Sequence, residues 1–329
     1  MPLPLLFIGI AAVTGISGVS KTIGAAVDQS NAKKLNQNSD ERIENAALRL
    51  EELRRQCGEA LDNLGKEKIF VLDNNVKRFL DTFKKIKNVD FQNSEGLEEL
   101  SKFHVDSTDF EELEEISSFA SSMAKGSLMG IGGGALSAFG AYSAAGALAT
   151  ASTGTAIGTL SGAAASNATL AFFGGGSIAS GGLGVAGGTA ILGGLVAGPA
   201  LLIMGTIVGA KAGKNLEDAQ ANAAMATEYC EELENGAFQC IAIRRRTNMF
   251  YTALANTDAH FLPLICDMET VFNNEGDDYS LYCTESKKKI AMAASMAVTV
   301  KSILDTPILT ADGSLTAESD ELESHFLES

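Results

Sequence analysis

One stretch constrains this fold more than any other: from Gly126 to Ala210 the chain carries no charged side chain. Lys125 comes directly before it, and Lys211 and Lys214 follow it as boundary charges. A helix that crosses a bilayer needs about 20 apolar residues, so this charge-free stretch is long enough for two to four crossings. In water the same residues would have to be covered by other helices. The stretch therefore predicts a membrane-insertion region.

Small residues recur at four-residue spacing along the charge-free stretch. Such lines let helix backbones approach closely in a membrane, whereas each glycine costs about 1 kcal/mol in a soluble helix. Residues 189–210 are the strongest candidate for a span, and residues 150–188 suit a re-entrant connection or a polar interior. We predict that these glycines pack the inserted helices: Gly126, Gly130, Gly134, Gly158, Gly162, Gly184, Gly188, Gly194, Gly198, Gly205 and Gly209.

Aromatic anchors are scarce, since the chain has no tryptophan. Permanent membrane proteins place Trp and Tyr at both bilayer interfaces. The composition therefore favours a segment that inserts conditionally or packs inside protein.

The N-terminal residues 1–30 contain a second apolar segment, residues 3–26. No basic residue precedes Lys21, although a secretory signal begins with a basic region. Three interpretations stay open: a span or re-entrant helix, a helix buried against the charge-free stretch, and a cleaved signal.

The flanks of the charge-free stretch, residues 31–125 and 211–306, are amphipathic. Apolar residues recur there at alternating steps of three and four, which is the seam of a coiled coil. Gly65 interrupts the phase of the first seam, and Pro263 interrupts the second. The first seam is Ile43, Ala46, Leu50, Leu53, Cys57, Ala60 and Leu64, then Ile69, Leu72, Val76, Phe79, Phe83 and Ile86. The second is Ala226, Cys230, Leu233, Ala237, Cys240, Ile243, Phe250 and Leu254, then Phe261, Ile265, Met268 and Phe272, with Ile290, Ala294, Ala297, Ile303 and Leu304 on a last helix.

Because no seam can be buried alone, we expect an all-α fold. Its body would be a long antiparallel helical or coiled-coil bundle, and the Gly/Ala-rich hydrophobic stretch would be a central helical hairpin. The acidic tail, residues 307–329, is expected to be solvated or disordered.

The charge balance excludes some partners. The net charge is −16, and both flanks are acidic, so nucleic acid and anionic headgroups are poor partners for the body. Five cysteines without a CxxC pair suggest neither a zinc site nor a disulfide framework, and they favour a reducing cytoplasm.

No motif predicts catalysis. Residues 182–187 fit G-x-G-x-x-G, but they follow no β-branched strand and no acidic residue follows at the required distance. His104, His260 and His325 are isolated from other metal ligands. We therefore predict no enzyme activity, no catalytic residue, no metal site and no cofactor.

The order of these parts resembles two groups of proteins, the cytolysin-type helical pore-forming toxins and the apolipoprotein L group. Both place a Gly/Ala-rich hydrophobic hairpin between long amphipathic helices, as Lys125 to Lys211 does here. Residues 166–182 also look like a glycine-rich motif of uncharacterised bacterial proteins. The resemblance implies a soluble bundle that shelters the hairpin and releases it into a bilayer as an oligomer.

We therefore expect a membrane-inserting protein that forms pores or permeabilises membranes, as a toxin or defence effector. Its partners would be the lipid bilayer and further copies of itself, and it would be membrane-associated with a soluble cytoplasmic form. The alternative is a permanently membrane-anchored scaffold whose coiled-coil bundle binds a protein partner.

Overall fold

The computed structural model describes residues 21–91, 107–125, 136, 139–141, 216–310 and 313–328. These residues form helices, and among them the only β-type contacts are two isolated bridges, Lys87 with Asp278 and Leu309 with Leu315. The predicted all-α class is confirmed. The elements are α1 (Lys21–Val71), a π-helical turn η1 (Leu72–Val76), α2 (Lys77–Phe83), α3 (Ser107–Lys125), α8 (Leu216–Glu275), a 3-10 turn η6 (Tyr279–Leu281), α9 (Thr284–Asp305) and α10 (Ala317–Glu328).

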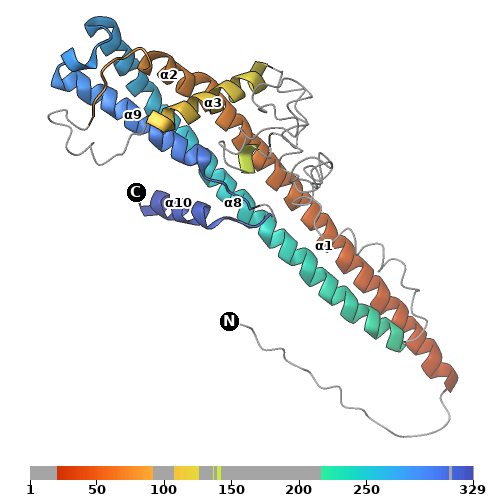
Figure 1. The fold of residues 1–329 in the computed structure, drawn as a ribbon. Helices are drawn as coiled ribbons and strands as arrows, with labels where there is room; N and C mark the ends of the chain where they lie inside the picture. Colours follow the sequence, from red (N-terminus) through yellow and green to blue (C-terminus); the bar gives the residue numbers. More distant parts are fainter. Residues whose placement is uncertain are drawn as a thin grey trace, which may run out of the picture.

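Two long helices, α1 and α8, form an arm that extends from a wider head made with α2, α3 and α9 (Figure 1). At 1.5 Å per residue, the 51 residues of α1 span about 75 Å. The helix α10 lies beside α8, near the middle of the molecule (Figure 1).

The two arm helices run parallel, so the expected antiparallel direction was wrong for this pair. The contacts advance together along both chains: Arg42 with Thr227 and Gln56 with Arg244, then, beyond the end of α1, Asn75 with Asp258 and Arg78 with Glu269. Apolar residues at alternating steps of three and four identify the buried face of a helix, but they do not indicate whether its partner helix runs parallel or antiparallel. Parallel helices of a bundle need a long crossover connection, and the chain from Lys84 to Asn215 supplies one.

Antiparallel packing does occur in the head. Lys289 of α9 lies 3.9 Å from Asp267 of α8, and Ser286 bonds to Glu275, so α9 returns along α8. Lys84 pairs with Glu114, and Lys77 lies 3.4 Å from Ser121, so α3 returns along α2.

The predicted seam residues are confirmed as the interior, since each is buried or half-buried. In the head they join an aromatic cluster around Phe79, which is fully buried. Its ring centroid lies 5.0 Å from that of Phe83, 5.7 Å from that of Phe110 and 5.5 Å from that of Phe261. Such tilted and stacked pairs add about 1 kcal/mol each beyond area burial.

Two expected interruptions do not break the helices. α1 continues through Gly65, and the change of seam phase is followed by the π-helical turn η1. α8 continues through Pro263. Proline removes one helical hydrogen bond, but Phe261 and Ile265 on either side of it are fully buried and hold both turns in place.

The acidic tail is helical over α10, which corrects the expectation of disorder, while its side chains Glu318, Asp320 and Glu321 are exposed to solvent as expected. Ile308 and Leu309 are buried, and α10 follows. The expectation rested on charge alone. The buried apolar residues before α10 anchor the tail to the body. Most of the N-terminal segment 3–26 lies outside the described residues.

Candidate functional site

Most of the predicted insertion residues lie outside the described part of the chain. This holds for every glycine predicted to pack the inserted helices and for Lys211 and Lys214, while Lys125 is the last residue of α3. The structure does describe four residues near the start of the charge-free stretch, Leu136, Phe139, Gly140 and Ala141, and all four are buried. They locate the candidate site.

Gly65 of α1 and Gly140 meet at a close backbone crossing. A Cβ at Gly65 would overlap the carbonyl oxygen of Leu136, and a Cβ at Gly140 would overlap that of Leu61. Only glycine fits such a contact from both sides. The close approach of the two backbones explains why residue 65 is a glycine. The seam pattern had suggested only that Gly65 interrupts the coiled-coil phase.

The carbonyl oxygen of Ala141 is held by the C-terminal segment. The backbone N–H groups of Ile308 and Leu309 donate to it, at 2.8 Å and 3.1 Å between nitrogen and oxygen. We call Leu61, Gly65, Lys68, Ile308 and Leu309 the dock, because these residues contact the start of the charge-free stretch.

Lys68 is the charged residue of the dock, and its side chain is fully buried. Its Nζ donates to the carbonyl oxygen of Leu304 at 3.4 Å and lies 6.0 Å from the centroid of the Phe139 ring. Burial lowers the pKa of Lys68 to about 7, and the nearby carboxylate of Asp305 acts in the opposite direction.

Sequence reasoning missed Lys68, although a signal was present. It follows Leu64 by one helical turn and Leu61 by two, and both leucines are buried. A lysine on the apolar face of a helix either reaches water along its stem or is buried at a cost. Here it is buried.

The π-helical turn η1 fixes α3, which leads into the charge-free stretch. Ser117 of α3 donates to the Leu72 carbonyl oxygen at 2.9 Å, and Ser121 bonds to the carboxylate of Asp73. A π-turn rearranges the helical hydrogen bonds and so allows a side chain of another helix to reach the Leu72 carbonyl. The end of α3 is therefore positioned by polar contacts as well as by the core.

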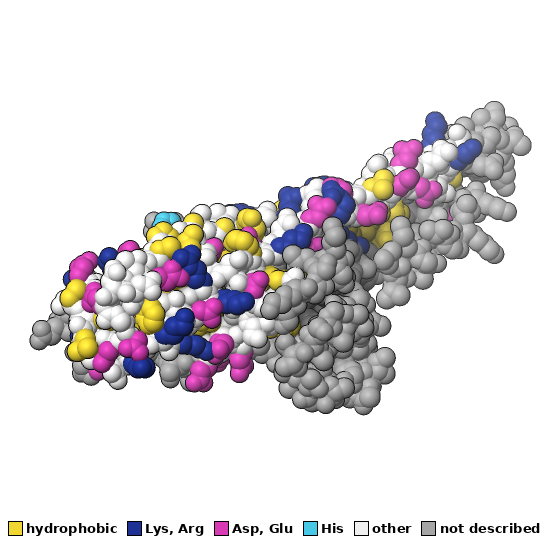
Figure 2. Space-filling model, turned by 90° about the horizontal axis from the view of Figure 1, so that it is seen from above, with side chains coloured by type: hydrophobic (Ala, Val, Ile, Leu, Met, Phe, Trp, Pro, Cys, Tyr) yellow, Lys and Arg dark blue, Asp and Glu magenta, His cyan; other side chains and the backbone are white. Residues whose placement is uncertain are grey.

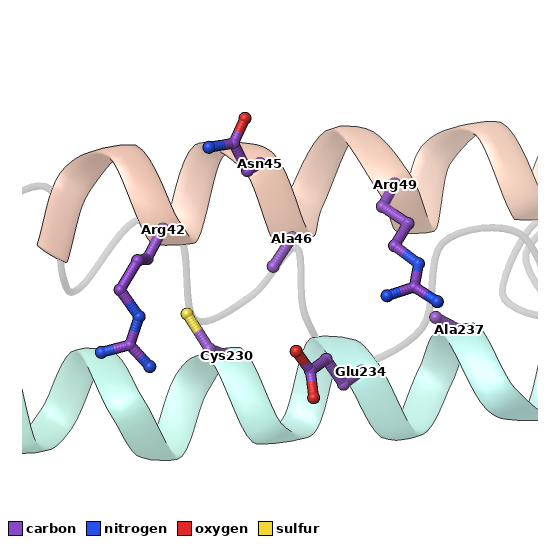
Figure 3. Close-up of a pocket in the computed structure, with 7 residues that line it drawn as sticks. All are labelled: Arg42, Asn45, Ala46, Arg49, Cys230, Glu234 and Ala237. Atoms are coloured by element: carbon purple, nitrogen blue, oxygen red, sulfur yellow. The ribbon is translucent and has the colours of Figure 1, made fainter. Parts of the chain in front are cut away.

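A shallow cleft of about 250 Å³ lies between α1 and α8 on the arm (Figure 3). Arg42 and Arg49 point toward α8 on either side of Ala46, and Glu234 lies opposite them (Figure 3). Small side chains at the seam leave this gap, and its rim is charged. The lining residues are Arg42, Asn45, Ala46, Arg49, Cys230, Glu234 and Ala237.

The described residues show no arrangement suited to metal chemistry, since no group of three metal-ligating side chains occurs among them. All five cysteines are free. Burial raises the pKa of Cys57 to about 12 and raises that of Cys240, so neither thiol is an activated nucleophile. The absence of a catalytic site and of a cofactor stays a prediction.

Within the described residues, no helix is both long and apolar enough to span a membrane. Of the charge-free stretch, only residues 136 and 139–141 belong to these described residues.

Comparison of the chain with protein-family models, with curated proteins and with solved structures found no match.

Proposed function

We propose that this protein inserts its charge-free stretch into a lipid bilayer and permeabilises it, as a toxin or defence effector. The observation that carries the proposal is the dock, where the helical body buries residues near the start of that stretch. The sequence of Gly126–Ala210 supplies the apolar length, and the dock supplies a place where the body covers part of it. Several copies would be needed to line a pore, so a homo-oligomer is part of the proposal.

The surface of the helical body supports the proposal that the charge-free stretch inserts and that the body stays outside the bilayer. Figure 2 shows acidic and basic side chains interspersed over the described part of the visible face, along both arm and head. Burying a charged side chain at the centre of a bilayer costs about 3 kcal/mol. The body is therefore suited to water, and insertion is assigned to the charge-free stretch alone.

The alternative, an anchored scaffold that binds a partner through its coiled coil, has less support. The seam residues of α1 and α8 already bury one another within the chain. A partner helix would have to displace one of them or bind elsewhere. The proposal therefore places the function of the protein in the bilayer.

A substitution in the strongest span tests the proposal. Purified protein is added to vesicles that contain a self-quenching dye, and Leu202→Lys is compared with wild type. Because a lysine at the centre of a span costs about 3 kcal/mol, leakage should fall on the order of 100-fold. The matched control is Leu48→Lys, which makes the same change on α1 at a side chain that is 56% exposed.

The outcome separates the two functions. Leakage that falls in Leu202→Lys and persists in Leu48→Lys supports permeabilisation. A wild-type protein that is extracted only with detergent and releases no dye would support the anchored scaffold instead.

A further inference from the structure

The C-terminal segment contributes Ile308 and Leu309 to the dock and is fastened to α8 beyond it. After α9 ends at Asp305, Ile308 and Leu309 bind the carbonyl oxygen of Ala141, as described above. The chain then turns through Gly313, whose φ of 84° is in the left-handed region that favours glycine. It returns beside itself, since the Thr316 N–H donates to the Ile308 carbonyl oxygen at 3.0 Å.

The returning chain is anchored to the arm at a point outside the dock. Arg246 of α8 is buried, donates to the Ser319 hydroxyl at 2.8 Å, and forms an ion pair with Asp320. A buried arginine bonded to a carboxylate makes a strong, directional contact. Ser319 is fully buried as well, so α10 is held firmly at its first turn.

Residues 136 and 139–141 of the charge-free stretch are therefore held by three parts of the body. Gly65 and Lys68 of α1 contact them, the ring centroid of Phe119 of α3 lies 5.9 Å from that of Phe139, and Ile308 and Leu309 bond to Ala141. The α1 contact belongs to a helix of 51 residues that packs along α8. The C-terminal side is a short segment joined to the body by α9 at one end and by the Arg246 contact at the other.

We propose that residues 306–310 and 313–322 form an autoinhibitory strap, whose release from α8 frees residues 136 and 139–141 for insertion. That release of the strap leads to membrane insertion rests on the proposed function. The strap itself is a property of the body in water, and it can be measured without lipid.

Two variants open the strap from opposite ends of the same contact. Arg246→Ala removes the guanidinium group on α8. Asp320→Ala removes the carboxylate on α10 with which it pairs and leaves the sequence of α8 unchanged. The controls are Arg245→Ala, an exposed arginine next along α8, and Glu318→Ala, an exposed carboxylate in the first turn of α10. Circular dichroism and thermal melting verify that each variant keeps the helical body.

Hydrogen–deuterium exchange in lipid-free protein gives the first readout. Loss of a charge-assisted contact should speed exchange in peptides covering 136–141 on the order of tenfold in both strap variants. Both controls should exchange like wild type. If peptides covering 317–322 exchange faster while 136–141 stays protected, the C-terminal segment does not restrain the stretch, and the strap is refuted.

Flotation with neutral phosphatidylcholine vesicles gives the second readout. Faster exchange at 136–141 together with several-fold more vesicle-bound protein supports both the strap and the insertion function. Faster exchange without any gain in binding supports the strap and contradicts the proposed function. Unchanged exchange at 136–141 in both variants overturns the strap, whatever the vesicles show.

Discussion

At the scale of single residues, the buried amine of Lys68 makes the dock sensitive to pH. An unfolded chain holds a lysine proton up to its ordinary pKa of 10.5, whereas folded Lys68 loses its proton near pH 7 because burial disfavours the charge. Between these values the unfolded state binds more protons, so the free energy of unfolding rises with pH. Below pH 7 both states are protonated, and the folded state carries the full cost of the buried charge.

Lys68→Met should therefore stabilise the protein and remove this part of its pH dependence. Wild type should gain about 2 kcal/mol of stability between pH 7 and pH 9 from Lys68, and the methionine variant should lack that gain. Urea unfolding at both pH values measures the difference. Lys66→Met, at an exposed position of the same helix, is the control and should follow wild type. Equal pH slopes in Lys68→Met and wild type would contradict the buried amine.

At the scale of elements, Gly58 and Gly65 of α1 should respond oppositely to the same substitution. Gly58 has open space around its missing Cβ, so Gly58→Ala should stabilise α1 by about 0.5–1 kcal/mol through helix propensity. Gly65→Ala would place a methyl group against the Leu136 carbonyl oxygen, and overpacking of this kind costs about 1–3 kcal/mol. Thermal melting measures both changes. Equal and favourable effects at both positions would show that the crossing with Gly140 does not form.

The seam shows which parts of these elements the sequence could predict. Spacing of three and four identified the buried faces of α1, α8 and α9, because helical geometry alone determines which residues share a face. The direction of α8 relative to α1 could not be predicted, since it depends on how the intervening chain returns. Lys68 and the C-terminal strap were missed for a related reason, because both depend on contacts between distant segments.

The candidate site was predictable only in part. The charge-free stretch was evident from the absence of charge over Gly126–Ala210, and this property needs no structure to be seen. Which surface of the body receives it could not be read from the sequence. Gly65 appeared as an interruption of a seam, although its role is to let a second backbone approach.

At the scale of the whole molecule, the parallel arm separates the two ends of the charge-free stretch. Gly140 lies beside Leu61 and Gly65, whereas Leu216 begins α8 about three turns before Thr227, which contacts Arg42. At 1.5 Å per residue these points are roughly 45 Å apart along α1. If the body stays folded during insertion, the arm must lie along the membrane surface, because its charged faces cannot enter the bilayer.

The same geometry predicts an even number of crossings. The helices α3 and α8 both pack on the body formed with α1, so the chain must leave and return on one side of the membrane. The basic residues Lys125, Lys211 and Lys214 at the two ends agree with a common side. Single cysteines at Ser118, Ser161 and Lys214, in a cysteine-free background, can be labelled with an impermeant maleimide on sealed vesicles. Positions 118 and 214 should label from the same side, and position 161 should be protected there.

Detergent-solubilised samples, in which all three cysteines should react, provide the control for intrinsic reactivity. Labelling of positions 118 and 214 from opposite sides would mean an odd number of crossings. The parallel arm would then have to come apart on insertion, because α3 and α8 cannot share one folded body across a bilayer whose polar and apolar layers together are about 40 Å thick. Same-side labelling is the result expected if the arm and head survive insertion intact and only the charge-free stretch leaves the dock.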